Sequence, residues 1–253
     1  MTCATPADFR ATEARQPMQR FRAIFFSSLY AGVVVGLLVT FAQQISTAPL
    51  ILRAEVYEKA AEATARAGPP ALQPDHAVAG HDHDQPAWEP ADGFERTAYS
   101  AAANILTAIG FALVLCGVVA TQGGLSSWRV SLVWGLAGFA VFFAAPSLGL
   151  PPKLPGMPTA DLEPRQVWWI ATAAATAAGL GLLAYRRSAL TVALAGLLIV
   201  APHVIGAPQA IEAETNVPGE LARDFVVAAS VCSFLFWTVL GSATGAIYRR
   251  FSA

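Results

Sequence analysis

Residues 23–52 read AIFFSSLYAGVVVGLLVTFAQQISTAPLIL and contain no charged side chain. An α-helix needs about 20 predominantly apolar residues to cross the hydrocarbon core of a bilayer. Further charge-free stretches of at least that length follow, at 97–128, 130–152, 166–185, 188–211 and 225–248. We therefore expect an all-α integral membrane protein, a six-transmembrane-helix bundle with spans near 21–46, 97–121, 129–148, 166–185, 189–206 and 224–248.

The composition of the whole chain agrees with this expectation. Of its 253 residues 55% are hydrophobic and 13% are charged, and the mean hydropathy is +0.50. A soluble domain carries about twice that charged fraction. The spans are expected to be helices because a helix satisfies its own backbone hydrogen bonds in lipid, and no span alternates in the way that a barrel strand does.

Basic residues predict the orientation, because they gather on the cytoplasmic side of a membrane protein. With both termini in the cytoplasm, the inner segments hold nine basic residues and only two acids, Asp8 and Glu13. The nine are Arg10, Arg15, Arg20, Arg22, Arg129, Arg186, Arg187, Arg249 and Arg250. The outer side is then acidic and attracts cations. The alternative is that acids simply accumulate in translocated loops.

The chain divides into three parts on this basis. Residues 1–20 form a cytoplasmic N-terminal segment, within which Met18 is an alternative start. Residues 21–253 form the six-helix membrane domain. Residues 47–95 form an extracytoplasmic insertion within it, with an amphipathic helix near Leu50–Ala67 followed by a loop rich in His and Pro.

A repeated pattern suggests three outward-and-return helical hairpins. The first, third and fifth spans end in Ala48-Pro49, Ala145-Pro146 and Ala201-Pro202, and proline stops or kinks a helix. The pattern is short, and coincidence is the competing interpretation. Two Gly-x-x-x-Gly motifs, at Gly32 and Gly36 and at Gly241 and Gly245, are typical of close helix packing.

The insertion holds candidate metal ligands. His81, Asp82, His83 and Asp84 are consecutive, His76 precedes them, and Glu55 and Glu58 lie on one face of the expected helix. Imidazole and carboxylate together suit divalent ions such as cobalt, nickel and zinc. A short His-Asp run also occurs in plain polar linkers, which is the alternative.

Other candidates lie near the outer ends of the spans. His203 follows Pro202 at the end of the fifth span, where an ionisable residue is a functional candidate. The expected spans contain no Asp, Glu, Lys or Arg, so polar groups such as Gln43, Gln44 and Asn104 are the candidates for a transport path. The alternatives are an interfacial hydrogen bond for His203 and links between helices for the amides.

Several classes of protein are excluded by the motifs that the sequence lacks. It has no Gly-x-x-x-x-Gly-Lys-Ser/Thr phosphate loop, no His-Glu-x-x-His and no Gly-x-Ser-x-Gly, and we expect no enzyme. The basic residues are scattered membrane anchors, so no nucleic-acid partner is expected. Cys116 and Cys232 both lie inside spans and are interpreted as packing residues.

From Met18 onward the sequence resembles the CbtA family of proposed cobalt transporter subunits. The segments that carry the resemblance are Phe21–Thr40 with Gln43, Pro49–Ile51, Ala54–Glu58, His81-x-His83, Trp88–Gly93 with Glu95-Arg96, Asn104–Leu106, Pro146–Gly156, Ala201–His203, Gly206–Pro208 and Val217–Pro218 before Leu221-Ala222. The family pattern has an acid between Pro152 and Leu154. Lys153 stands there in this chain, which argues against a metal ligand in that turn.

The resemblance implies cobalt uptake linked to cobalamin synthesis in the bacterial cytoplasmic (inner) membrane. It also implies a small single-span, His-rich partner subunit (CbtB-like). The leading hypothesis is therefore the membrane subunit of a divalent transition-metal permease that carries Co²⁺, with Ni²⁺ and Zn²⁺ as alternatives and no fixed cofactor. The second hypothesis is a non-transporting metal-binding membrane protein, such as a sensor or docking subunit.

Deleting residues 68–84 tests the role of the His-rich loop. A loop that captures metal raises its local concentration, so the deletion should raise the cobalt concentration needed for half-maximal uptake while the membrane domain stays folded. Radioactive cobalt uptake over a range of concentrations measures this. An unchanged concentration dependence would identify the loop as a linker.

Overall fold

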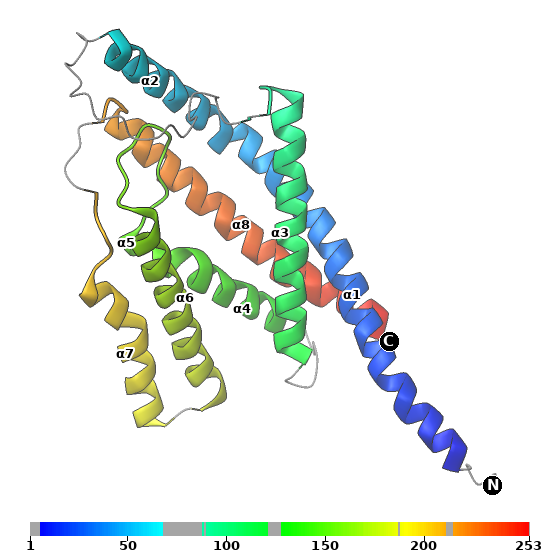
Figure 1. Cartoon of the computed structure of the whole chain (residues 1–253). Helices are drawn as coiled ribbons and strands as arrows, with labels where there is room; N and C mark the ends of the chain where they lie inside the picture. The colour runs from blue at the N-terminus through cyan, green and yellow to red at the C-terminus, as the bar shows by residue number, and fades with distance from the viewer. Residues whose placement is uncertain are drawn as a thin grey trace, which may run out of the picture.

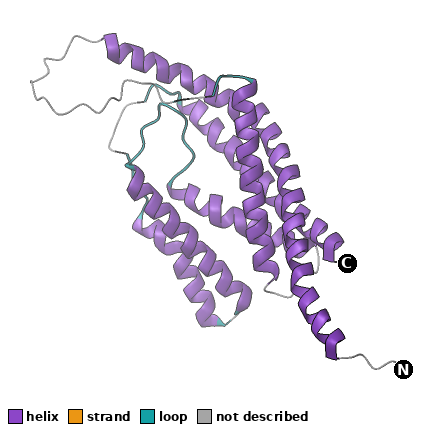
Figure 2. Ribbon diagram, turned by 45° about the vertical axis from the view of Figure 1, so that its right-hand side comes forward, coloured by secondary structure: helices purple, strands orange, loops and turns teal. Residues whose placement is uncertain are grey.

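The charge-free stretches form helices in the computed structural model, which describes residues 6–67, 88, 90–120, 128–186, 188–210 and 215–252. Within these ranges the regular structure is helical and no strand occurs (Figure 2), which confirms the all-α fold. The elements are α1 (Pro6–Ile45), α2 (Thr47–Ala67), α3 (Phe94–Ala120), α4 (Trp128–Phe139), the π-helix η1 (Ala140–Ala144), α5 (Ala145–Gly149), α6 (Leu162–Tyr185), α7 (Ala189–Ile205) and α8 (Gly219–Ser252).

Five helical segments in the described part are long and apolar enough to cross a membrane. They are Met18–Ile45, Phe94–Ala120, Trp128–Gly149, Leu162–Tyr185 and Gly219–Phe251. The third consists of α4, η1 and α5 in direct succession. The remaining predicted span corresponds to α7, which is apolar but has 17 residues and is shorter than the others.

Proline explains where α1 ends and α2 begins. A proline has no N–H, and its ring clashes with the carbonyl four residues earlier, which for Pro49 belongs to Ile45. The first helix ends at Ile45, and α2 starts at Thr47 after a turn at Ser46. The expected helix of the insertion thus exists, and it extends in roughly the direction of α1 (Figure 1).

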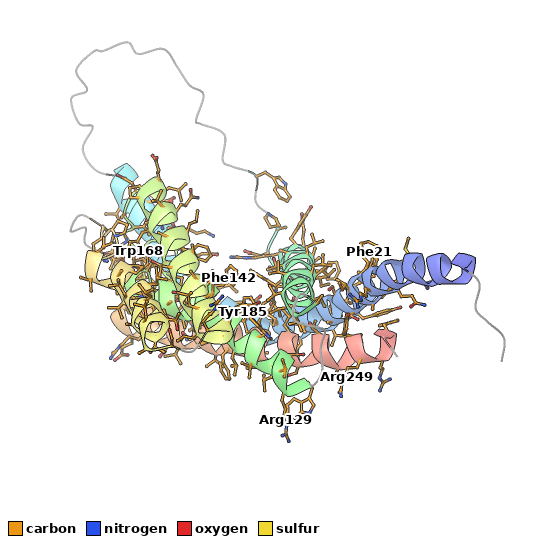
Figure 3. All side chains as sticks on the ribbon, turned by 90° about the horizontal axis from the view of Figure 1, so that it is seen from below. Phe21, Arg129, Phe142, Trp168, Tyr185 and Arg249 are labelled. Atoms are coloured by element: carbon orange, nitrogen blue, oxygen red, sulfur yellow. The ribbon has the colours of Figure 1, made fainter. Side chains whose placement is uncertain are left out.

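Both chain ends lie at the same end of the bundle, and α2 lies at the opposite end (Figure 1). Arg129 at the start of α4 and Arg249 near the end of α8 extend outward from the ribbon at the terminal end (Figure 3). Below, "outer end" means the end that carries α2. Along the chain, α1 runs toward the outer end and α8 runs away from it (Figure 1).

The helices pair differently from the three predicted hairpins. Helix α1 packs along α3 as expected, but α4 packs mainly along α8, and α6 mainly along α7. Helix α7 packs on α6 and α5 rather than along α8. The third hairpin was therefore wrongly predicted, and in the second the third span contacts α6 through η1 and α5 but not along α4. The partner of a helix is set by its complementary face and not by its neighbour in sequence.

Glycines supply those faces. A Cβ atom added at Gly135 of α4 would lie 3.0 Å from Cα of Gly241 on α8, and one added at Gly36 of α1 would lie 2.5 Å from Cα of Ile105 on α3. Between α6 and α7, a Cβ at Gly179 would lie 3.0 Å from the carbonyl oxygen of Ala195. Backbones approach this closely only where no side chain intervenes, which is how membrane helices gain packing energy.

Three apolar clusters follow the length of the bundle. The largest joins α1, α3 and α8 around Val35, Ala108 and Leu240, and a second near the terminal end contains Cys116 and Tyr248. The third lies at the outer end, where Ala54 of α2 packs with Leu154 and Val217 of the connecting segments. The third cluster holds α2 and the outer connections against the ends of the spans.

Replacing Gly135 with Ala should destabilise the bundle by about 1–3 kcal/mol, because the added methyl group has no room against α8. The matched control is Gly110→Ala on α3, where a Cβ meets nothing within 4 Å. That change should be neutral or stabilise by up to about 1 kcal/mol, since Ala favours the helix. Unfolding in detergent micelles measures both, and equal effects would contradict the close α4–α8 contact.

Candidate functional site

A cavity of about 650 Å³ opens between the outer halves of α1, α3 and α8. The π-helix η1 and the first turns of α2 and α6 complete its wall. Its polar lining includes Gln43, Gln44, Thr47, Ser100, Asn104, Thr107, Cys232 and Ser233. Polar side chains from α1, α3 and α8, which belong to long apolar segments, converge here with Thr47 of α2.

The centre of the polar wall is a pair of amides on α1 and α3. Asn104 Nδ2 donates to Gln43 Oε1 at 2.7 Å and to Thr40 Oγ1 at 3.0 Å. Thr40 Oγ1 in turn donates to the carbonyl oxygen of Gly36 at 2.8 Å. Both donor hydrogens of Asn104 are thereby used, which leaves its oxygen as an acceptor beside the cavity.

The outer rim of the cavity carries a cluster of three charges. The Arg96 guanidinium, at the start of α3, donates to Glu55 Oε2 of α2 at 3.3 Å and to Asp92 Oδ1 at 3.1 Å. A second contact, from Nη2 to Glu55 Oε1, measures 2.5 Å. Arg96 and Asp92 line the cavity, and Glu55 contacts Arg96 without lining the cavity itself. The two-pronged ion pair also ties α2 to α3.

Aromatic side chains close the cavity on the side of the terminal end. The ring centre of Phe111 lies 4.8 Å from that of Trp237 and 4.9 Å from that of Phe142, and the rings of Phe142 and Trp237 are stacked at 5.5 Å. Trp237 is 3% exposed and packs against Gly138. The cavity therefore ends in a tightly packed apolar floor, and Figure 3 shows Phe142 within the bundle.

The π-helix η1 brings two of these rings to the wall. The N–H of Ala145 bonds to the carbonyl of Ala140, five residues earlier, so the helix widens just before Pro146. This extra residue in the turn places both Phe142 and Phe143 on the cavity lining. Single π turns of this kind are frequent at functional sites.

Of the predicted site residues, Gln43, Gln44 and Asn104 come together here. Glu55 lies beside the rim, but its carboxylate is paired with Arg96. Glu58 packs against Gly156 of the segment after α5, where a Cβ atom would lie 3.2 Å from Glu58 Cβ. The two glutamates therefore contact different partners.

His203 does not line this cavity. Its ring lies edge-on to Trp168 of α6, with ring centres 5.9 Å apart, and its Nε2 is buried with no hydrogen-bond partner in the described part of the chain. The Trp168 indole N–H donates to the carbonyl of Pro202 at 3.2 Å. His203 thus belongs to the α6–α7 contact, and the structure does not bring it together with Gln43.

The predicted loop ligands His76, His81, Asp82, His83 and Asp84 lie outside the described residues. Among the described residues, no group of three or more His, Cys, Asp or Glu side chains is arranged to hold a metal ion. The polar groups that the structure does bring together at membrane depth are amides, hydroxyls and one thiol.

Comparison with known protein families shows to which family the chain belongs. A model of the CbtA family, described as "probable cobalt transporter subunit", matches residues 21–249. The chain belongs to the CbtA family. No curated protein and no solved structure matches it. Family membership and five long apolar helices together identify this CbtA family member as a multi-pass membrane protein of a transporter family, in which a subunit implies a partner.

Several residues of the site in this CbtA family member were missed by reasoning from sequence. Cys232, interpreted as a packing residue, lines the cavity, with its Sγ 3.3 Å from Ser46 Oγ. Phe111, Phe142 and Trp237 come from three helices, and nothing in the sequence links them. Pro146, which follows η1, was the one sequence signal for the π-helix, because proline marks an irregular or kinked helix.

The amide pair should be energetically coupled. A double-mutant cycle compares Gln43→Ala, Asn104→Ala and the double variant with the wild type. It should give a coupling free energy of about 0.6 kcal/mol and at most about 1.7 kcal/mol, the range for hydrogen bonds between membrane helices. Gln44, which lines the cavity but is not bonded to Asn104, is the matched control and should give a coupling near zero. Unfolding of the single and double variants in detergent measures both cycles.

Proposed function

We propose that this chain is the membrane subunit of a divalent metal permease that takes up Co²⁺, and that the cavity receives the ion from the outer side. The observation that carries the proposal is the amide pair Gln43–Asn104 in a cavity at membrane depth, within a chain of a probable cobalt transporter subunit family. Amide and hydroxyl oxygens can replace water around a dication without holding it as tightly as a charged site would.

The proposed orientation places both termini in the bacterial cytoplasm and the cavity toward the periplasmic side. Support comes from Arg20, Arg22, Arg129, Arg249 and Arg250, which all belong to the terminal end of the spans. This arrangement counts α7 as the sixth span. The membrane potential then drives a dication inward without ATP.

In the proposed path, the acidic outer side concentrates the ion, and His76, His81, His83, Asp82 and Asp84 of the loop gather it. The rim follows, where Asp92 and Glu55 offset the charge of Arg96. The ion then reaches the oxygens of Gln43, Gln44 and Asn104 and the Cys232 thiol, ligand types that cobalt accepts. His203 has no place on this path, because it lies outside the cavity.

The aromatic floor is the barrier in this proposal. Phe111, Phe142 and Trp237 leave no polar route toward the terminal end, so transport requires them to part. Ring movement is easiest where η1 interrupts the regular hydrogen bonding of the third span. A small single-span His-rich partner subunit (CbtB-like) and a link to cobalamin synthesis are part of the same proposal and rest on the family resemblance.

Cobalt uptake by cells tests the proposal. Cells that make the chain with its partner should take up radioactive cobalt faster at limiting concentration than cells without it. Asn104→Leu keeps the branching of the side chain at Cγ but removes its oxygen and its amide hydrogens. It should lower the initial rate about tenfold, the factor that corresponds to about 1.4 kcal/mol for one lost ligand.

The matched control is Gln209→Ala, an exposed amide that does not line this cavity, and it should leave uptake unchanged. Equal uptake with and without the chain would refute the permease. Metal binding without flux in proteoliposomes would instead identify a sensor or docking subunit, the second hypothesis from the sequence.

A further inference from the structure

A second cavity, of about 1090 Å³, lies at the outer end of α6. The segment from Gly149 to Met157 forms one side, the first turns of α6 form another, and Pro208 and Gln209 after α7 close it. It adjoins the first cavity, since Ile51, Pro152, Trp169 and Phe225 line both. Nothing in the proposed transport path uses it.

This second cavity is positively charged. Lys153 and Arg165 line it, and no Asp or Glu is among its lining residues. Asp161 and Glu163 are near Arg165 in sequence, and Glu58 packs against Gly156 of the wall, but none of the three lines the cavity. A cavity that carries two cations repels a metal dication and attracts an anion.

Arg165 has unused hydrogen-bonding capacity inside the protein. Its Nε is buried and has no hydrogen-bond partner among the described residues. A buried donor without a partner costs free energy until an acceptor arrives. The 24-residue helix α6 begins beside the cavity at Leu162, and the Asp161 side chain makes no capping hydrogen bond to its first turn.

The cavity is also apolar along α6. Leu162, Trp169 and Ile170 line it, and Leu162 and Ile170 are each 61% exposed. Helix α6 is one of the long apolar segments, so Arg165 near its start lies at the membrane interface and the apolar residues continue into the hydrocarbon region. An anion that fits must therefore carry an apolar tail.

We propose that this cavity binds an anionic phospholipid from the leaflet opposite the termini. The phosphate lies between the Arg165 guanidinium, which offers a planar pair of donors, and the Lys153 ammonium, which acts as a point charge. Lys153 Nζ already donates to the carbonyl of Pro158, which holds it at the cavity. The acyl chains follow Leu162 and Ile170 into the bilayer.

Thermal unfolding of the purified full chain in a neutral detergent tests the proposal. Three additions are compared: phosphatidylglycerol, phosphatidylcholine and inorganic phosphate. Phosphatidylglycerol should raise the melting temperature more than phosphatidylcholine, because a ligand of the native state stabilises it, and inorganic phosphate should have no effect. Arg165→Gln should weaken the affinity for phosphatidylglycerol about tenfold, as expected for a lost charge-assisted hydrogen bond, and Lys153→Gln should weaken it less.

The matched control is Arg223→Gln, an exposed cation of α8 that lines neither cavity, which should retain the wild-type affinity. Equal melting temperatures of Arg165→Gln and wild type in phosphatidylcholine establish that the variant is folded. Equal stabilisation by both lipids, or equal loss in Arg223→Gln, would refute the site. Stabilisation by inorganic phosphate alone would refute the lipid as its ligand. The measurement involves no cobalt, so its result is independent of the transport proposal.

Discussion

Backbone contact at glycine is the interaction on which the rest of this structure depends. In a bilayer, burying apolar side chains between helices gives no hydrophobic advantage, because lipid tails are equally apolar. Helices therefore associate where small residues let their backbones approach closely. Gly32 and Gly36 allow the backbone of α1 to contact α3, and Gly135 and Gly241 allow the backbones of α4 and α8 to contact each other. The second crossing also places Gly138 under Trp237, and that ring forms the floor of the outer cavity.

The two neighbouring cavities differ in charge and share a wall. The first has Asp92 and Arg96 at its rim, with Glu55 paired to Arg96, and an interior of neutral oxygens and one thiol. The second has two cations and an apolar side toward the membrane. Trp169 and Phe225 separate them. Charged groups remain at the outer end of the spans, where water reaches them, and only neutral polar groups continue inward.

Sequence reasoning recovered the helices because an uninterrupted apolar stretch is a local property. It also recovered the Gly-x-x-x-Gly contacts and the meeting of Gln43 with Asn104. It failed on the pairing of α4, α6, α7 and α8, because pairing depends on which faces are complementary in space. It assigned Glu55 to metal, whereas the structure pairs it with Arg96, 41 residues away in sequence. The loop histidines lie outside the described residues, so their role remains a prediction.

In the proposed arrangement α7 is the sixth span, and its length then has a consequence for the surrounding lipid. Seventeen residues rise about 26 Å along a helix axis, whereas the hydrocarbon core is about 30 Å thick. Lipid that meets α7 along its length has to thin by about 4 Å, a hydrophobic mismatch that costs a fraction of a kcal/mol for each ångström. The α6–α7 edge is therefore the place where the two water phases come closest, and chains of this kind should favour thin membranes.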